Sequence, residues 1–161
     1  MRKKTSFQIF VLFFCCFYSE SAWVAPAAKL RLTEVNDLNL GTWAQASMTG
    51  NDPVCVYRND SIDTYHVTGT DNSTISPSSL ALENAAKTSQ IAYTLNWSNT
   101  SSPGAINLAD GVLTAASGAN ITQQTCSGGD SSNFKVDINN SALAAAPNGT
   151  YTATVTFVIQ E

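Results

Sequence analysis

The sequence predicts an all-β fold, an antiparallel β-sandwich. Short segments of alternating apolar and polar residues recur along the chain, and turn-forming residues separate them. No stretch has the 3.6-residue period of a long amphipathic helix. The clearest strand closes the chain, where threonines alternate with Tyr151, Ala153, Val155, Phe157 and Ile159.

The predicted elements follow one another at short intervals. Strands are expected at 29–32, 37–43, 54–58, 63–70, 79–84, 89–98, 133–139 and 150–160. Segment 106–118 is expected to form two short strands about the turn pair Asp110-Gly111. Segment 71–79 is a loop of polar turn-forming residues, and 141–149 is expected to form one turn of helix.

Composition indicates one globular domain. The chain has 161 residues, of which 43% are hydrophobic and 12% charged, so it is too apolar for disorder and long enough to bury a core. The net charge is −4. Removal of an N-terminal leader would take away three basic residues and one acidic residue, leaving a charge near −6, which argues against nucleic acid as a partner.

The N-terminus has the pattern of an export signal. A basic start, Arg2 to Lys4, precedes an apolar run, 7–18, that is short for a membrane span. Ala25 and Ala27 are the small residues expected before a cleavage site. We therefore expect a signal peptide over 1–27 and a mature domain over 28–161 with no membrane span. An uncleaved membrane anchor is the alternative.

Two cysteines remain after cleavage. Cys15 and Cys16 would leave with the signal, and Cys55 and Cys126 would then form one disulfide in an oxidising compartment. Closing a loop of about 70 residues would stabilise the fold by about 4 kcal/mol. With His66 as the single histidine and no metal-type spacing, neither a metal nor a cofactor is expected.

Catalytic residues are not expected. His66 alternates with its neighbours on a predicted strand, and the sequence offers it neither an activated nucleophile nor an orienting carboxylate. The acidic residues are scattered through turns, where aspartate supplies local hydrogen bonds. The sequence therefore predicts a protein that is not an enzyme.

The last strand raises a question about its edge. It has no proline, lysine or arginine, the residues that often protect an exposed edge from pairing with another chain. No segment follows that could cover it. Its partner must be an earlier segment of this chain or a strand from another protein.

Several motifs in order resemble those of one family. "PNGTYTATVTFVI" resembles the C-terminal strand of chaperone–usher pilus subunits. "DLNLGTW" and "VCVYRNDSIDTYHVTGT" resemble segments of spore coat protein U-like pilins. "IAYTLNWS" is similar to a central strand of these and of alternate-class pilins.

The resemblance implies an immunoglobulin-like sandwich that lacks its last strand and is completed by a donor strand. A periplasmic chaperone would fill the groove first, and the N-terminal extension of another pilus subunit would replace it, with an outer-membrane usher as a further partner. The product would be an extracellular fimbrium. The implied acceptor groove strand carries Tyr151, Ala153, Val155, Phe157 and Ile159, and the implied donor segment carries Leu30, Leu32 and Val35.

Two alternatives stay open. Segment 29–32 could pair with the chain's own last strand, which would give a complete monomeric sandwich. The protein could also be a self-contained secreted binding module or adhesin, for carbohydrate or a host surface. In that case Trp43 is the aromatic residue expected to stack on a ligand.

Overall fold

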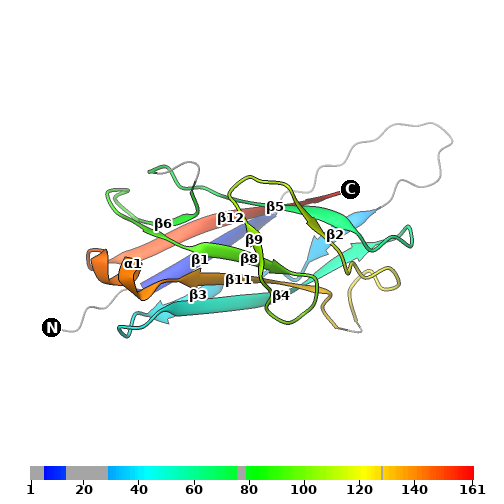
Figure 1. The fold of residues 1–161 in the computed structure, drawn as a ribbon, viewed down its shortest axis with the longest axis horizontal. Helices are drawn as coiled ribbons and strands as arrows, with labels where there is room; N and C mark the ends of the chain where they lie inside the picture. The colour runs from blue at the N-terminus through cyan, green and yellow to red at the C-terminus, as the bar shows by residue number, and fades with distance from the viewer. Residues whose placement is uncertain (1–5, 14–28, 76–78, 128) are drawn as a thin grey trace.

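A computed structural model describes residues 6–13, 29–75, 79–127 and 129–161, and these form a sandwich of two β-sheets (Figure 1). The strands are β1 (Ser6–Phe13), β2 (Leu30–Thr33), β3 (Leu38–Thr42), β4 (Met48–Arg58), β5 (Tyr65–Asp71), β6 (Ala81–Asn84), β7 (Gln90–Ala92), β8 (Thr94–Ser98), β9 (Ile106–Leu108), β10 (Thr114–Ala116), β11 (Ser132–Ile138) and β12 (Thr150–Gln160). One short helix, α1 (Asn140–Ala145), precedes β12.

The smaller sheet has five antiparallel strands in the order β2-β4-β11-β8-β9. Its longest pairing joins β4 to β11 over seven consecutive positions, from Val54 with Ser132 to Met48 with Ile138. The larger sheet has seven strands and contains the path β10-β5-β12-β1-β3. Strand β6 lies beside β12 on the same edge as β5, and β7 pairs with β6.

This strand order confirms the immunoglobulin-like sandwich. Immunoglobulin domains place strands A, B, E and D in one sheet and C, F and G in the other. Here β2-β4-β11-β8 matches the first set, and β5-β12-β1 matches the second. The place of the last strand, G, is taken by β1 from the opposite end of the chain, and β1 runs parallel to β12 (Figure 1).

Trp97 is at the centre of the core between the sheets. It is fully buried, and its ring packs against Phe157 of β12 at 5.7 Å and edge-on against Tyr65 at 6.4 Å. The indole N–H donates to the Tyr65 hydroxyl at 3.0 Å, and that hydroxyl also bonds to Ser132. This network satisfies the polar atoms that the core buries with these aromatic rings.

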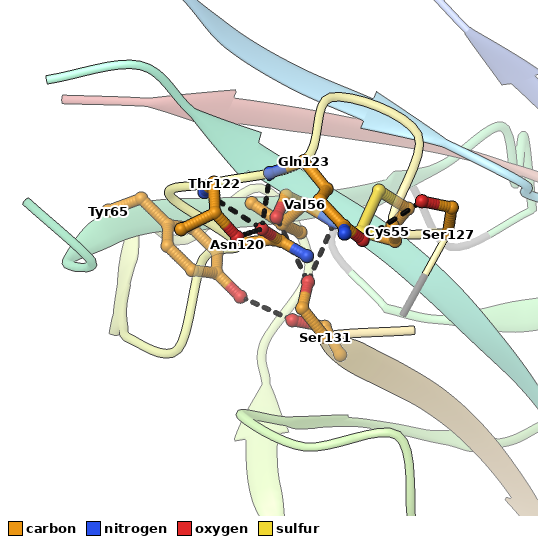
Figure 2. The surroundings of a disulfide bond; sticks show 10 residues. Cys55, Val56, Tyr65, Asn120, Thr122, Gln123, Ser127 and Ser131 are labelled. Atoms are coloured by element: carbon orange, nitrogen blue, oxygen red, sulfur yellow. Dashed lines mark hydrogen bonds between the residues drawn. A yellow bond between two sulfur atoms is a disulfide. The ribbon is translucent and has the colours of Figure 1, made fainter. Parts of the chain in front are cut away.

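The disulfide between Cys55 and Cys126 is confirmed. It ties a long loop to the end of β4, as Figure 2 shows. Next to it, Asn120 N–H donates to the Val56 carbonyl at 2.7 Å, and the Ser131 hydroxyl bonds to both main-chain groups of Val56. The loop therefore continues the pairing of β4 where β11 has ended.

Two predicted segments are shared between the sheets in a way that the sequence did not indicate. Segment 89–98 was expected as one strand, but it forms β7 and β8 in different sheets, because the chain crosses between the sheets at Tyr93. Segment 106–118 does form two strands about a turn, but they are not paired with each other. Strand β9 joins β8 and β10 joins β5, so this turn also links the two sheets.

Candidate functional site: a slot beside the last strand

The candidate site is the place of one strand in the larger sheet. We call it the slot, and its walls are residues 150–157 of β12 and residues 38–42 of β3. In the full chain, β1 fills the slot, with eight parallel pairs to β12 and four antiparallel pairs to β3. Among the strands that the structure describes, only β1 connects β3 to the rest of this sheet.

The main chain of β12 presents hydrogen-bonding groups to the slot. Thr154 uses its N–H and its C=O to bond Asn72 on the opposite edge. Successive residues of a strand direct these groups to opposite sides. The N–H and C=O groups of the odd-numbered residues 151, 153, 155 and 157 therefore face β1. An empty slot would leave these groups without strand partners, which is costly wherever water cannot replace them.

The predicted acceptor residues form the apolar side of β12. Four of them are between 0% and 3% exposed and face the core: Tyr151, Ala153, Val155 and Phe157. Ile159 is half-buried and lies beyond the segment that pairs with β1. The same residues that pack on the core thus carry the main-chain groups that face the slot. Their role as a groove for another protein's strand stays a prediction.

The β3 wall is held by side chains. Leu40 packs so closely over Gly50 of β4 that a Cβ at position 50 would overlap it. The pairing with β1 shifts register at this point, and Gly41 adopts a φ of +80°, as the glycine of a β-bulge often does. The Asn39 side chain accepts from Gly41 N–H at 3.0 Å and stabilises the bend. Neither wall carries a charged residue.

The opposite edge of β12 is closed by specific side chains. The Asn72 side chain accepts from Thr154 N–H at 2.9 Å, and Asn72 N–H donates to the Thr154 carbonyl at 3.1 Å. This bond pair bridges the interval between the pairing of β12 with β5 and its pairing with β6. Asn72 thus makes one continuous edge from two strands.

Two carboxylates, the half-buried Asp71 and the buried Glu83, hold the loop that follows Asn72. Asp71 accepts from the N–H groups of Ser73 at 2.7 Å and Ala81 at 2.6 Å, and burial raises the pKa of Asp71. Glu83 accepts from Ser73 Oγ at 2.9 Å and from Ile75 N–H at 2.7 Å. Burial acts to raise the pKa of Glu83, but these and further hydrogen bonds outweigh it and lower the pKa below its ordinary value.

The predicted donor residues lie in the other sheet. Leu30 and Leu32 belong to β2, which pairs with β4, and Leu32 is 2% exposed. The alternative in which segment 29–32 pairs with the last strand is therefore wrong, because the edge of β4 takes that segment instead. Val35 follows β2 and packs partly buried against the core. A donor role for these three residues stays a prediction, and it requires β2 to leave β4.

Trp43 and His66 lie outside the two walls of the slot. The Trp43 indole N–H donates to the Ala46 carbonyl and to Asn140 Oδ1, each at 3.0 Å, and the ring packs partly buried against the core. His66 lies on β5 opposite Gln160. Within the described residues, no three acidic, histidine or cysteine side chains gather as metal ligands, and no helix is long and apolar enough to cross a bilayer.

Sequence reasoning missed the occupant of the slot. Residues 6–13 are apolar without a strict alternation, a composition that fits an export signal and a buried strand equally. The pairing with both walls shows that this segment forms a strand in the full chain, and it does not test the export signal. The signal itself, over 1–27, stays a prediction, and residues 1–5 and 14–28 lie outside the described part of the chain.

Comparison with known proteins supports the fold. No family model matches the chain, and no curated protein matches it by sequence. Among solved structures, one described as a chaperone–tip adhesin complex in CFA/I fimbriae biogenesis is similar, with a TM-score of 0.52 and 14% identity. The match covers 81% of this chain and 41% of that one, so this chain corresponds to less than half of its neighbour. The fold is thus similar to that of a fimbrial protein.

Proposed function

We propose that the protein is a structural subunit of an extracellular pilus and accepts a strand from a neighbouring protein in its slot. Residues 1–27 are removed on export through the periplasm, so the processed domain, 28–161, has an open slot. One observation carries the proposal: among the described residues, every strand pairing on the slot edge of β12 comes from residues 6–13. Removal of the leader leaves a long, unguarded strand edge, which recruits another strand.

The partners follow from the chemistry of the slot. An incoming strand needs alternating apolar side chains, to lie level with the buried residues of β12. Main-chain bonds supply affinity, and the side chains supply specificity. A periplasmic chaperone is the first such partner, and another pilus subunit replaces it at an outer-membrane usher. The similar solved structure is described as a complex of a chaperone with a tip adhesin, which supports a chaperone as one of the partners.

The donor part of the proposal concerns the other end of the processed chain. The segment that carries Leu30, Leu32 and Val35 passes to the slot of a second copy. It first leaves β4, to which it is joined by four register pairs. The proposed role uses no catalytic residue and no cofactor. We make no separate proposal for a binding module, because the Trp43 ring packs partly buried against the core and its indole N–H is bonded within the chain.

The test uses the processed domain, 28–161, purified from the periplasm with its chaperone removed. Light scattering and thermal unfolding are measured alone and with two peptides. The first has the sequence of residues 28–40, and the second, the slot probe, has residues 6–13 flanked by lysines for solubility. The control is the 28–40 peptide with Leu30→Asn and Leu32→Asn.

The expected result is a poorly stable or self-associating domain whose melting temperature rises by about 10 °C with a fitting peptide and not with the control. A rise of that size corresponds to about 3–5 kcal/mol for a domain of this length. A monomer that melts cooperatively and ignores both peptides would overturn the proposal, because its slot would be closed by the domain itself.

A further inference from the structure

Two sequences in the chain place a glycine directly after a side chain that can react with the main chain. Asparagine precedes glycine once, at Asn148-Gly149, and aspartate precedes glycine once, at Asp110-Gly111. We propose that Asn148-Gly149 is a site of spontaneous covalent modification, at which Asn148 deamidates through a succinimide, and that the fold protects Asp110-Gly111 from the corresponding reaction. This inference goes beyond the proposed function and does not depend on it.

The reaction at Asn148 needs only water. The main-chain nitrogen of Gly149 loses its proton and attacks Cγ of Asn148, so that a bond forms between these two atoms while the bond from Cγ to Nδ2 breaks. Nδ2 leaves as ammonia, and a five-membered succinimide ring remains. Water then opens the ring at one of its two carbonyl carbons, which gives aspartate or isoaspartate. Glycine favours ring closure because it has no Cβ to restrict the main chain.

The reacting groups at this site are not engaged by the fold. Asn148-Gly149 lies in the turn between α1 and β12 (Figure 1), where Asn148 is exposed and Gly149 is half-buried. The Tyr151 hydroxyl donates to the Pro147 carbonyl at 3.1 Å and holds the ends of this turn. Among the described residues, no hydrogen bond engages the Asn148 side chain or the Gly149 N–H. The attack therefore breaks no hydrogen bond of the folded chain.

Asp110-Gly111 has the opposite environment. The Gly111 N–H, which carries the nitrogen that would attack, donates to the Gly69 carbonyl at 3.0 Å. The carboxylate that would be attacked accepts from Asp71 N–H through Asp110 Oδ1, also at 3.0 Å. Ring closure at Asp110 would require both bonds to break, so it is confined to molecules that have opened locally.

Asn72 is the matched comparison among the asparagines, because it also precedes a small residue, Ser73. Its side chain accepts from Thr154 N–H at 2.9 Å. The N–H of Ser73 donates to Asp71 Oδ1 at 2.7 Å. Both groups that would react at Asn72 are thus bonded elsewhere, and we expect Asn72 to deamidate more slowly than Asn148.

Deamidation at Asn148 changes the beginning of the last strand. The product carries one negative charge next to residues 150–160, which have none. Isoaspartate also adds one carbon atom to the main chain, within the short span that the hydrogen bond between Tyr151 and Pro147 closes. The modified protein therefore differs from the new protein in charge and in the geometry of this turn.

The test follows these sites in the purified, folded protein during storage at neutral and at mildly alkaline pH. Peptide mapping by mass spectrometry measures the exchange of an amide for a carboxyl group, and an isoaspartyl methyltransferase assay on the same peptides detects isoaspartate. Asn148 is expected to react at least about tenfold faster than Asn72, because Asn72 reacts only from opened molecules. Its rate should be higher at alkaline pH, since the nitrogen attacks without its proton.

Storage in urea tests the protection by the fold. Unfolding is expected to accelerate the reactions of Asn72 and Asp110 by about tenfold or more, and that of Asn148 by less than about threefold. Rates at Asn72 and Asp110 that are as high in the folded protein as in urea would overturn the proposed protection.

Gly149→Ala is the control variant for the mechanism. A Cβ at position 149 would lie 3.7 Å from its nearest neighbour, a ring atom of Tyr151, which is an ordinary packing distance. The variant should therefore fold and should deamidate at Asn148 about tenfold more slowly, because alanine restricts the main chain that glycine leaves free. An equal rate in the folded variant, deamidation without isoaspartate, or an Asn148 no faster than Asn72 would overturn the proposed site. None of these outcomes bears on the slot, which peptide binding tests separately.

Discussion

The two edges of β12 are closed in different ways. Toward β5 and β6, the ladder is completed by the Asn72 side chain, and Glu83 and Asp71 fix the loop behind it. Toward the slot, residues 150–157 meet β1 through consecutive main-chain pairs. The first edge depends on particular side chains at particular positions. The second asks of its partner only an extended segment with suitable alternation, which is what an exchangeable partner can supply.

Both edges of β12 are supported by the same core, in which Trp97 packs against Phe157. Trp97→Ala should cost about 5 kcal/mol of unfolding free energy, because it leaves a large cavity and removes the hydrogen bond to Tyr65. Urea unfolding of the full chain and of the processed domain with bound slot probe measures this loss. It should be the same in both, and a much smaller loss in one of them would mean that the two forms have different cores.

The disulfide is expected to stabilise the fold without affecting either edge of β12. Replacing both Cys55 and Cys126 by serine should lower the unfolding free energy by about 4 kcal/mol, since the bond joins residues 71 positions apart. Affinity for the slot probe, measured by anisotropy below the unfolding transition, should stay within about twofold. A large loss of affinity in the folded variant would contradict the separation of the slot from the disulfide.

Asn72→Ala weakens the edge made by β5 and β6. The variant leaves Thr154 N–H without its side-chain acceptor, and we expect a loss of about 1–2 kcal/mol in urea unfolding. Asn148→Ala, at an exposed position before β12, is the control and should change stability by less than about 0.5 kcal/mol. Equal effects of the two would remove the case for a side-chain clamp on this edge.

Gly41→Ala weakens the slot instead. No atom lies within 4 Å of the place where a Cβ would stand, so the cost comes from the positive φ and should be about 1 kcal/mol. Slot-probe affinity of the processed domain should fall about fivefold. Asn72→Ala should leave that affinity nearly unchanged, and the reverse pattern would contradict the assignment of the two edges.

The smallest expected effect is on how the stability of the fold depends on pH. The folded-state pKa of Glu83 is below the ordinary 4.5, so its contribution is complete above pH 4.5 and is lost as the pH falls through the folded value. Glu83→Gln should therefore give a shallower decline of urea midpoints from pH 5 to pH 3 than the unaltered chain. Asp60 and Asp137 also have lowered pKa values and preserve part of the slope. Parallel curves would show that Glu83 does not act in this way.

Local alternation predicted most strands but not how they share the two sheets. The last strand was foreseen because its apolar residues keep one phase throughout. In segment 89–98, Ile91 and Leu95 are both buried and are four residues apart, as in one continuous strand, although they belong to different sheets. The alternation of apolar residues therefore does not reveal where the chain crosses from one sheet to the other. The first half of β4 was missed because Gly50 and Pro53 look like turn residues, whereas Gly50 is needed beneath Leu40.

The candidate site was predicted in part. The β12 wall was predicted because the last strand lacks the residues that protect an edge and therefore needs a partner strand. The other wall, β3, could not be assigned, because a single sequence does not show which segments share a sheet edge. The donor segment was placed by resemblance, and the structure pairs it with β4 through contacts that act over long sequence separations.

The disulfide also sets how far the chain can lengthen when it is stretched. A force applied to the two ends of the chain cannot extend the residues between Cys55 and Cys126, because the disulfide transmits the force directly from one cysteine to the other. At about 3.5 Å per extended residue, the 71 positions so protected amount to about 250 Å of length that is never released. Only the segments outside the bond can uncoil, so a molecule under tension keeps the six strands β5 to β10 within the closed loop and extends by a length that the position of the bond defines.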